Sequence, residues 1–456
     1  MRIKKTQRAS DGYTPIDPSH SVMNRLQEVF ETQLEKSLRP EKIGTQVIAK
    51  RFKEVGIELN QRQVSRIEAQ LLNSDEGIIH IEVEDDQVVR AGFTSEVAIQ
   101  EALAASVGNL VSNIERFVTD LYDNLPRIVR EMMTEISDLV LQRLKRSARP
   151  MLRDRRTTMS LFEANLSQVW GKAIDLLEMH LAMSIEAGES FNAEFRPSAS
   201  SNNDHVFEVL SRLHARACQV ASEVITLLKA GHADGAHARW RSLHEISVVS
   251  SFIAKHGNDL AERYLLHEGI ESYRAAQQYQ DCCQRLGYEP MTVKEFSNIC
   301  SRRQSLIEQF GKSYDNDYGW ASGAVGKERP TFSDIEKAVG LDHLRPYYRM
   351  ASYNVHANPK GVFFKLGLYP GTEDILLAGP SNVGLIDPGH ATALSLGQVT
   401  VTLLITRPNL GRLVVCDILI KLGDEIGEKF WLADRKLQTD ANDSVIHTDQ
   451  AQSPKN

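Results

Sequence analysis

Hydrophobic positions along most of the chain recur with the three- to four-residue period of an amphipathic helix. In the C-terminal half, successive periodic segments end at Gly231, Gly257 and Gly287, and glycine is the residue that most readily ends a helix. Two strongly apolar segments, residues 389–405 and 410–430, follow the same period and close this region. We therefore predict a mainly α-helical fold whose C-terminal domain is a multi-helix bundle.

Residues 45–93 show a different order of elements. Two helical segments, TQVIAKRFKEV (45–55) and NQRQVSRIEAQLL (60–72), are separated by a glycine turn, and two strand-like runs, GIIHIEV (77–83) and QVVRAGF (87–93), follow. Helix, turn, helix and β-hairpin is the order of a winged helix-turn-helix, and a small helical cap with a hairpin has the same order. The pattern leaves both interpretations open.

In the winged helix-turn-helix interpretation, the second helix contacts nucleic acid. Arg62 and Arg66 are four residues apart, so they lie on one face of this helix. These two residues are therefore candidate nucleic-acid contacts, and a DNA-binding regulator is one function that the N-terminal part of the chain suggests.

Changes in composition divide the chain. FRPSASSNND (195–204) is polar and rich in turn-forming residues, and it predicts a linker between domains. The runs GVFFKLGLY (361–369) and DILLAGP (374–380) predict a second short hairpin. The predicted parts are a flexible N-terminus (1–20), a helical module with a hairpin (21–94), a connector of long helices interrupted near Pro126 (95–194), a helical domain (205–435) and a disordered tail (436–456).

The connector carries the strongest basic cluster of the sequence, LKRSARPMLRDRR (144–156). A run of cations is often a solvated linker, but it is also what contact with phosphate groups requires. The candidate nucleic-acid contacts in this run are Lys145, Arg146, Arg149, Arg153, Arg155 and Arg156.

Composition narrows the class of protein. The 456 residues are 42% hydrophobic, which is enough for a large core, and the net charge of −7 argues against a chain that binds polyanions over its whole surface. Five cysteines without a CxxC pair suit a reducing compartment, and no apolar run is long enough to span a bilayer. We expect a cytoplasmic protein without a membrane partner.

Several familiar signatures fail at a necessary position. GAVGKE (323–328) contains Gly-Lys, but Ala321 replaces the first glycine of a P-loop, and Glu328 replaces its Ser or Thr. HEISVV (244–249) has Val248 where a zinc protease needs a second histidine, and no Cys/His spacing typical of zinc sites occurs. We therefore expect no metal and no cofactor.

The segment HARWRSLHE (237–245) places His237, Arg241, His244 and Glu245 on one helical face, next to the apolar run ISVVSSFI. Buried charges of this kind are costly unless they are paired, and Arg241 could pair with Glu245 one turn later. The alternative to pairing is a functional site that includes Arg241 and His244.

A second polar stripe occurs in YYRMASYNVHANPKG (347–361), where Arg349, Ser352 and His356 share a helical face just before the helix ends. If the two stripes converge, they form a basic site in which an imidazole moves protons near neutral pH and guanidinium groups stabilise phosphoryl charge. A buried polar network that joins the two helices would have the same sequence.

The run from about residue 205 to 425 resembles an uncharacterised family of bacterial helical proteins, in segments such as SYNVHANPKG, YGWA (318–321) and GPSNVGLIDPG. Its two stripes also resemble the HEPN superfamily, in which an Arg, four to six residues and a His lie on one helix of a small bundle. Arg349 to His356 has the longest such spacing, although Met350 stands where these ribonucleases often have Asn.

The HEPN resemblance implies metal-independent RNA cleavage at a composite site in a homodimer, in a toxin or in defence against phage. In that function His356 would transfer the proton, Arg349 and Arg241 would contact phosphate, and Ser352 and His244 would orient the substrate or each other. RNA or DNA is the expected partner. A non-catalytic scaffold that binds a nucleotide or a partner through the same residues is the alternative.

Overall fold

The computed structural model describes residue 31 and residues 39–73, 79–93, 95–107, 114–357, 359–369, 372 and 375–450. Over these ranges the chain is mainly helical and contains no β-strand, so the predicted fold class is confirmed and both predicted hairpins are wrong. The chain forms two compact units, Met1–Thr157 and Thr158–Asn456. Residues 1–20 of the predicted flexible N-terminus lie outside the described residues.

The described part of the first unit begins with a helix, a turn and a second helix. A small apolar core of Phe52, Ile57 and Ile99 joins the first of these helices and the turn after it to a later helix that contains Ile99. Asn60 begins the second helix as predicted, because its side chain accepts a hydrogen bond from the Gln63 amide at 3.0 Å while the Gln63 side chain bonds back to the Asn60 amide. The helices of this unit are α2 (Pro40–Glu54), α3 (Gln61–Asn73), α4 (Asp85–Arg90), α5 (Glu96–Val107) and the first part of α6 (Ile114–Asn202).

The predicted wing is replaced by an extended segment and the short helix α4. The Gln70 side chain forms two hydrogen bonds with the backbone of His80. Its NH2 group donates to the His80 carbonyl (2.7 Å), and its oxygen accepts from the His80 backbone N–H (2.6 Å). Gln63 donates likewise to the Glu82 carbonyl at 2.8 Å. Glutamines of α3 thus take the place of a partner strand, and a capping box at Glu84 starts a helix where the second strand was expected.

Helix α6 is continuous from Ile114 to Asn202, through Pro126 and through most of the expected linker 195–204. The linker serines do not break it, because their hydroxyl groups donate to carbonyl groups of the preceding turn, as Ser200 does to Arg196 (3.1 Å). The chain turns only at Asn203, whose φ is 51°, and Asp204 caps the next helix.

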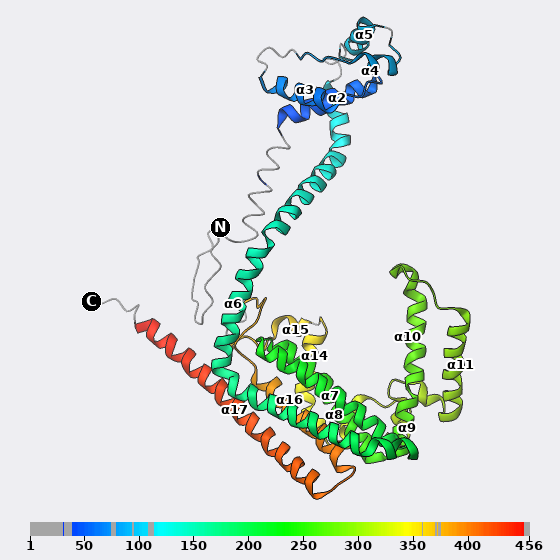
Figure 1. Ribbon diagram of the computed structural model, residues 1–456, viewed down its shortest axis with the longest axis vertical. Coiled ribbons are helices and arrows are strands. Elements are labelled where there is room, and N and C mark those ends of the chain that lie inside the picture. Colours follow the sequence, from blue (N-terminus) through cyan, green and yellow to red (C-terminus); the bar gives the residue numbers. More distant parts are fainter. Residues whose placement is uncertain are drawn as a thin grey trace. The chain divides into compact units, whose positions relative to one another are not determined.

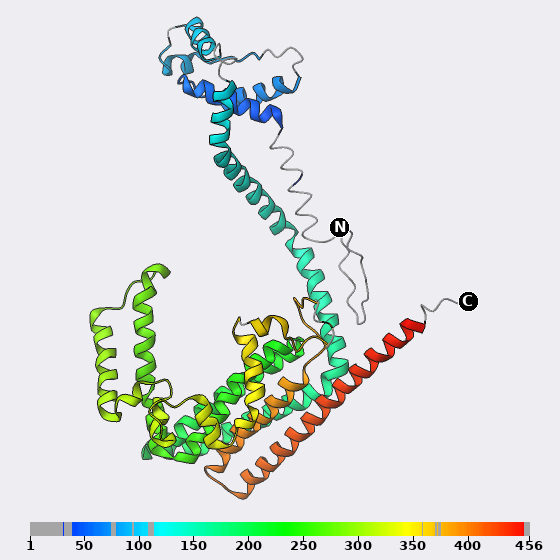
Figure 2. The same ribbon diagram turned by 180° about the vertical axis from the view of Figure 1, so that it is seen from behind.

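The second unit is a bundle around one large core. Helices α7 (His205–Lys229) and α8 (Ala233–His256) pack side by side, α16 (Ile386–Ile405) lies against both, and α17 (Leu410–Gln450) lies against α16 (Figure 1; Figure 2 shows the same packing from behind). The indole of Trp240 is fully buried in this core, and its N–H donates to the carbonyl of Ala391 in α16 at 2.9 Å. Polar as well as apolar contacts therefore bind α16 to α8.

Shorter helices connect α8 to α16. Within the second unit, α10 and α11 form a pair that extends away from the other helices (Figure 1). A capping box formed by Thr292 and Glu295 begins α11. The connecting helices are α9 (Asn258–Leu266), α10 (Glu268–Cys282), η2 (Cys283–Leu286), α11 (Val293–Phe310), η3 (Lys312–Asp315), η4 (Gly319–Ala321), α12 (Ser322–Val325), α13 (Phe332–Val339), η5 (Asp342–Leu344), α14 (Arg345–Val355) and α15 (Pro359–Phe363).

The segment of the second predicted hairpin binds to the start of α8. The Leu366 amide donates to the carboxylate of Asp234 in the first turn of α8 at 3.0 Å, and the amide of Ser381, which follows the second predicted strand, donates to the Gly231 carbonyl just before α8 at 2.9 Å. Residues 361–363 belong to α15, and residues 375–380 are irregular. This segment is therefore attached to the start of α8 rather than paired with itself.

The C-terminal end also differs from the prediction. Helix α17 continues to Gln450 through most of the tail that was expected to be disordered, and Leu437 is still buried. None of the helices in the described part of the chain combines the length and apolar character needed to cross a bilayer.

Candidate functional site

The polar stripe of α8 meets a buried acid that the sequence did not suggest. His244 and Glu336 are both completely buried, and the His244 Nε2 lies 2.9 Å from Oε1 of Glu336. The other carboxylate oxygen of Glu336, on α13, accepts a hydrogen bond from Arg345 at the start of α14. One carboxylate thus joins three helices, and the buried charge is paired on both of its oxygens.

Arg241 lies one turn before His244 and joins a second group of side chains. Its Nε donates to Glu245 at 3.2 Å, which is the pairing that the sequence left open. Its guanidinium lies over the ring of Tyr348, 4.6 Å from the centroid, and that of Arg345 lies 5.1 Å from the same ring. The Tyr348 hydroxyl donates to Glu245 at 2.6 Å. Burial and the Glu245 carboxylate raise the pKa of Tyr348, so this hydroxyl keeps its proton.

His237 occupies a more apolar place than His244. Its ring stacks on Trp240 at a centroid distance of 5.3 Å, and neither of its nitrogens has a hydrogen-bond partner among the described residues. Burial lowers the pKa of His237 to about 4, so the ring is neutral near pH 7. This end of the α8 stripe contributes to packing.

The inner face of α14 continues the network toward the end of the helix. The Ser352 hydroxyl donates to the Tyr348 carbonyl at 2.8 Å. The Asn354 side chain donates at 3.0 Å to Asp234, the same carboxylate that binds the Leu366 amide. Polar groups at the start, middle and end of α14 are therefore occupied by bonds within the bundle.

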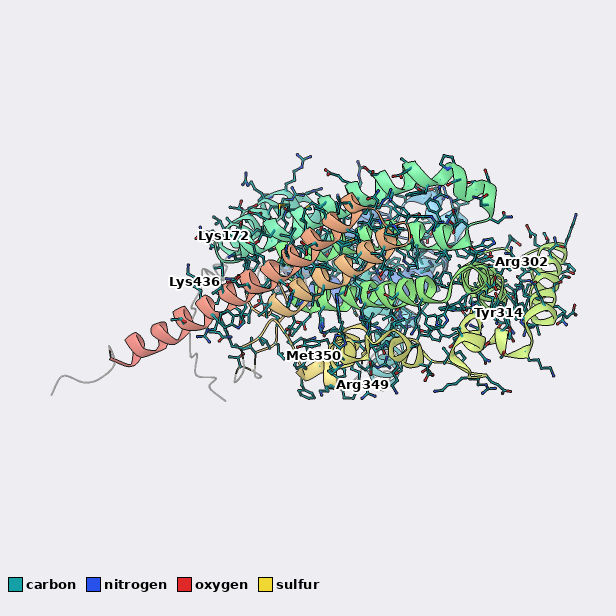
Figure 3. All side chains as sticks on the ribbon, turned by 90° about the horizontal axis from the view of Figure 1, so that it is seen from below. Lys172, Arg302, Tyr314, Arg349, Met350 and Lys436 are labelled. Carbon is teal, nitrogen blue, oxygen red and sulfur yellow. The ribbon has the colours of Figure 1, made fainter. Side chains whose placement is uncertain are left out.

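The outer face of α14 is different. Arg349 and His356 are exposed, and neither side chain has a hydrogen bond, ion pair or ring contact with another described residue. Figure 3 labels Arg349 at the margin of the bundle. Tyr353 lies between them in the spacing i, i+4, i+7, and the Lys360 ammonium lies 4.9 Å from its ring centroid. Arg349 and Tyr353 lie on α14, His356 directly follows its last residue, and Lys360 lies on α15; we call these four residues the outer stripe.

The structure brings the two predicted stripes side by side, but through different residues. Arg241 and His244 meet α14 and α13 through Arg345, Tyr348 and Glu336, whereas no described contact joins either of them to Arg349, Ser352 or His356. Sequence reasoning missed Tyr348 and Arg345, although Arg345 lies four residues before Arg349 and therefore on the same side of the helix. It also missed Tyr353 and Lys360, and nothing in the local pattern could have indicated Glu336.

The N-terminal candidates are all on the surface. Arg62 and Arg66 are exposed on α3, and Arg66 forms an ion pair with Glu82. With the wing absent from the described residues, DNA binding by this module stays a prediction. All six cations of the basic run are exposed on α6. In the described part of the chain, no three His, Cys, Asp or Glu side chains gather in an arrangement that could hold a metal ion.

Comparison with known proteins adds a family but no activity. No curated protein and no solved structure matches the chain. The resemblance to HEPN proteins stays a prediction. The resemblance to an uncharacterised family is confirmed for the part of the chain that begins in α7 and ends after α15: residues 207–367 match the model of DUF5677, a family of unknown function.

Proposed function

We propose that the outer stripe binds single-stranded RNA and cleaves it through proton transfer at His356, without help from a metal ion. The observation that carries the proposal is the contrast between the two faces of one short helix. Arg345, Tyr348 and Asn354 are bound within the bundle, while Arg349 and His356 are exposed without partners among the described residues.

The residue types of the outer stripe suit RNA. Arg349 and Lys360 supply cations on either side of Tyr353, and they are the groups that would contact phosphate oxygens. The half-buried ring of Tyr353 offers an aromatic surface on which an unpaired base can stack. A guanidinium, an ammonium, an aromatic ring and an imidazole together provide contacts for one short stretch of strand.

The proposed reaction needs only the 2′-hydroxyl of the substrate. His356 accepts the proton of this hydroxyl, and the 2′-oxygen attacks the neighbouring phosphorus. The P–O5′ bond breaks, which leaves a 2′,3′-cyclic phosphate on one fragment. Water supplies the proton for the 5′-hydroxyl of the other fragment. Arg349 and Lys360 stabilise the charge that develops on the phosphate oxygens.

In this proposal Arg241 and His244 are positioning residues rather than catalytic residues. They hold Tyr348 and Glu336, which in turn fix the inner face of α14. Ser352 bonds to its own helix, so it supports the same face. The predicted catalytic set therefore divides into groups that would touch RNA and groups that would fix the helix carrying them.

The test is cleavage of a fluorescent, unstructured RNA in the presence of EDTA, with detection of the cyclic phosphate. We expect His356→Ala to lower the rate by about 10²–10⁴-fold, the usual contribution of a proton-transfer residue, while the melting temperature stays unchanged. His343→Ala is the matched control, because His343 is also exposed in the second unit and bonds only to the Gly340 carbonyl within its own turn.

A second substrate separates cleavage from binding. RNA with 2′-O-methyl groups cannot cyclise, so it should bind to the outer stripe without being cut, and Arg349→Ala should weaken this binding. Binding without cleavage of the unmodified RNA would instead support the scaffold function. Normal cleavage by a folded His356→Ala protein would end the catalytic proposal.

A further inference from the structure

The basic run of α6 is ordered on the helix in a way that its sequence only partly indicates. Lys145, Arg149, Arg153 and Arg156 are spaced by four, four and three residues, so they share one face, and Arg146 lies beside the first of them. All five side chains are exposed. We call them the basic stripe.

The other two arginines of this part of α6 lie elsewhere on the helix. Arg143 precedes Arg149, the middle member of the basic stripe, by six residues, and Arg155 follows it by six, so each lies about 120° around the helix axis from Arg149. Both are exposed. Arg155, a candidate contact in the sequence, is therefore separated by geometry from the other candidates.

The charges of the basic stripe are not neutralised by acidic side chains in the described part of the protein. None of its five cations has an ion pair or a hydrogen bond with another residue that the structure describes. Asp154 is the only acid between residues 145 and 156. Five cations held along one helix face, without partners among these residues, are costly to bring together unless an external anion binds them.

We propose that the basic stripe binds the sugar–phosphate backbone of a double-helical nucleic acid without regard to sequence. The stripe extends from Lys145 to Arg156, eleven steps along the helix, or about 16 Å at 1.5 Å per step. Along that length a duplex presents roughly ten phosphate charges, at one per 1.7 Å of axis. A straight row of cations therefore faces a straight rod of opposite charge.

The composition of this stretch favours a duplex over a single strand. Residues 141–160 contain no Phe, Tyr, Trp or His, whereas proteins that bind single strands usually stack bases on aromatic rings. The only amide side chain in this range is Gln142, so the groups that read base edges are nearly absent. What remains is contact with phosphate.

An anionic membrane is the other polyanion that a basic helix could bind. Helices that lie in a membrane surface usually insert Trp, Phe or Leu, and here the exposed apolar residues are only Leu141, Met151 and Leu152, without an aromatic anchor. We therefore favour the duplex and treat vesicle binding as an outcome of the test. This inference concerns the first unit and does not depend on RNA cleavage by the outer stripe.

The experiment compares two double variants of the full-length chain that remove the same charge from the same helix. Arg149→Gln with Arg153→Gln removes two members of the basic stripe, and Arg143→Gln with Arg155→Gln removes the two arginines that lie off it. The probes are a mixed-sequence 20-base-pair DNA, its RNA counterpart, the single strands, and vesicles of phosphatidylcholine with phosphatidylserine. Helix content by circular dichroism checks folding.

We expect the stripe variant to lower the slope of log K against log salt by about 1.8, at roughly 0.9 for each phosphate group that is no longer neutralised. When the salt concentration rises from 50 to 200 mM, the affinity of the stripe variant should therefore fall about tenfold less than the affinity of the unchanged protein. The off-stripe variant should keep the slope of the unchanged protein. The DNA and RNA duplexes then distinguish which double helix is preferred.

Three results would overturn the inference. Equal effects of the two variants would mean that only net charge matters, and no salt-dependent duplex binding would remove the site altogether. Tighter binding to single strands or to vesicles than to either duplex would assign the stripe to a different partner. His356→Ala, which tests cleavage, should leave duplex affinity unchanged, so the two proposals fail separately.

Discussion

The inner and outer faces of α14 carry similar residue types in opposite circumstances. On the inner face, Arg345 and Tyr348 are held by two carboxylates of other helices. On the outer face, Arg349 and His356 have no partner among the described residues. The difference teaches that polar residues in one short helix cannot be assigned a common role from their spacing, because the neighbours on each face decide what each residue does.

The comparison between buried and exposed polar groups predicts a loss of stability at low pH. Burial lowers the pKa of His214 and of His237 to about 4. Because the unfolded chain takes up these protons near pH 6.5, stability from these groups is complete above that pH and is lost as the pH falls toward 4. Each histidine should cost about 2 kcal/mol by pH 5.

Urea unfolding at pH 7.5 and pH 5.0 measures this loss. His237→Met removes one titrating ring at a buried position and should reduce the difference between the two pH values by about 2 kcal/mol. His343→Ala, which removes an exposed ring, serves as the control. An unchanged difference in the His237→Met protein would show that this histidine is not the buried group that matters.

The next effect tests the centre of the inner face. Glu336→Ala removes the carboxylate that His244 and Arg345 share, so it should destabilise the second unit by about 3–5 kcal/mol, as breaking a buried ion pair does. The denaturation midpoint measures the change, and Glu308→Ala on the exposed face of α11 is the control. A loss below about 1 kcal/mol would contradict the assignment of Glu336 as the common partner.

A smaller effect is expected when only the hydroxyl of Tyr348 is removed and its ring is kept. Tyr348→Phe keeps the ring between Arg241 and Arg345 but loses the hydrogen bond to Glu245, so we expect a loss of about 0.5–1.5 kcal/mol. Tyr347→Phe is matched in chemistry, and Tyr347 is 43% exposed, so its effect should be near zero. Equal midpoints for the two variants would mean that the hydrogen bond to Glu245 adds nothing.

The smallest expected effects belong to Arg349→Ala and Ser352→Ala. Arg349 has no described partner, and the Ser352 hydroxyl only bonds to a carbonyl of its own helix, so each should change stability by less than about 0.5 kcal/mol. Thermal melting of the two proteins measures this. A clear drop for Arg349→Ala would move this residue from the outer stripe to the structural network.

Sequence periodicity was sufficient for the helical class and for helix ends where glycine adopts a positive φ, as at Gly231 and Gly257. It failed where a side chain forms the backbone hydrogen bonds that a neighbouring strand was expected to form. The strand-like segment near His80 pairs with Gln70 of α3, and the run after α14 is bound to Asp234. Neither of these side-chain contacts can be recognised from the local sequence.

The candidate site was predictable in part for the same reason. The helical spacing correctly paired Arg241 with Glu245, but His356, which it placed on one helical face with Arg349, follows the last residue of α14 with extended backbone angles. It could not determine which side faces the bundle, because that depends on Glu336, which lies 92 residues after His244 in the chain. Long-range pairing of charges is the information that periodicity lacks.

The contacts of Trp240 have a consequence for the meaning of the family match. Residues 207–367 include this indole, but its hydrogen-bond acceptors, the Ala391 carbonyl and the Ser395 hydroxyl, lie in α16 beyond the matched segment. A fragment cut at the family boundaries would leave the indole N–H without these acceptors and the adjoining apolar surface open to water. The segment that the family matches is thus shorter than the bundle that shares one apolar core.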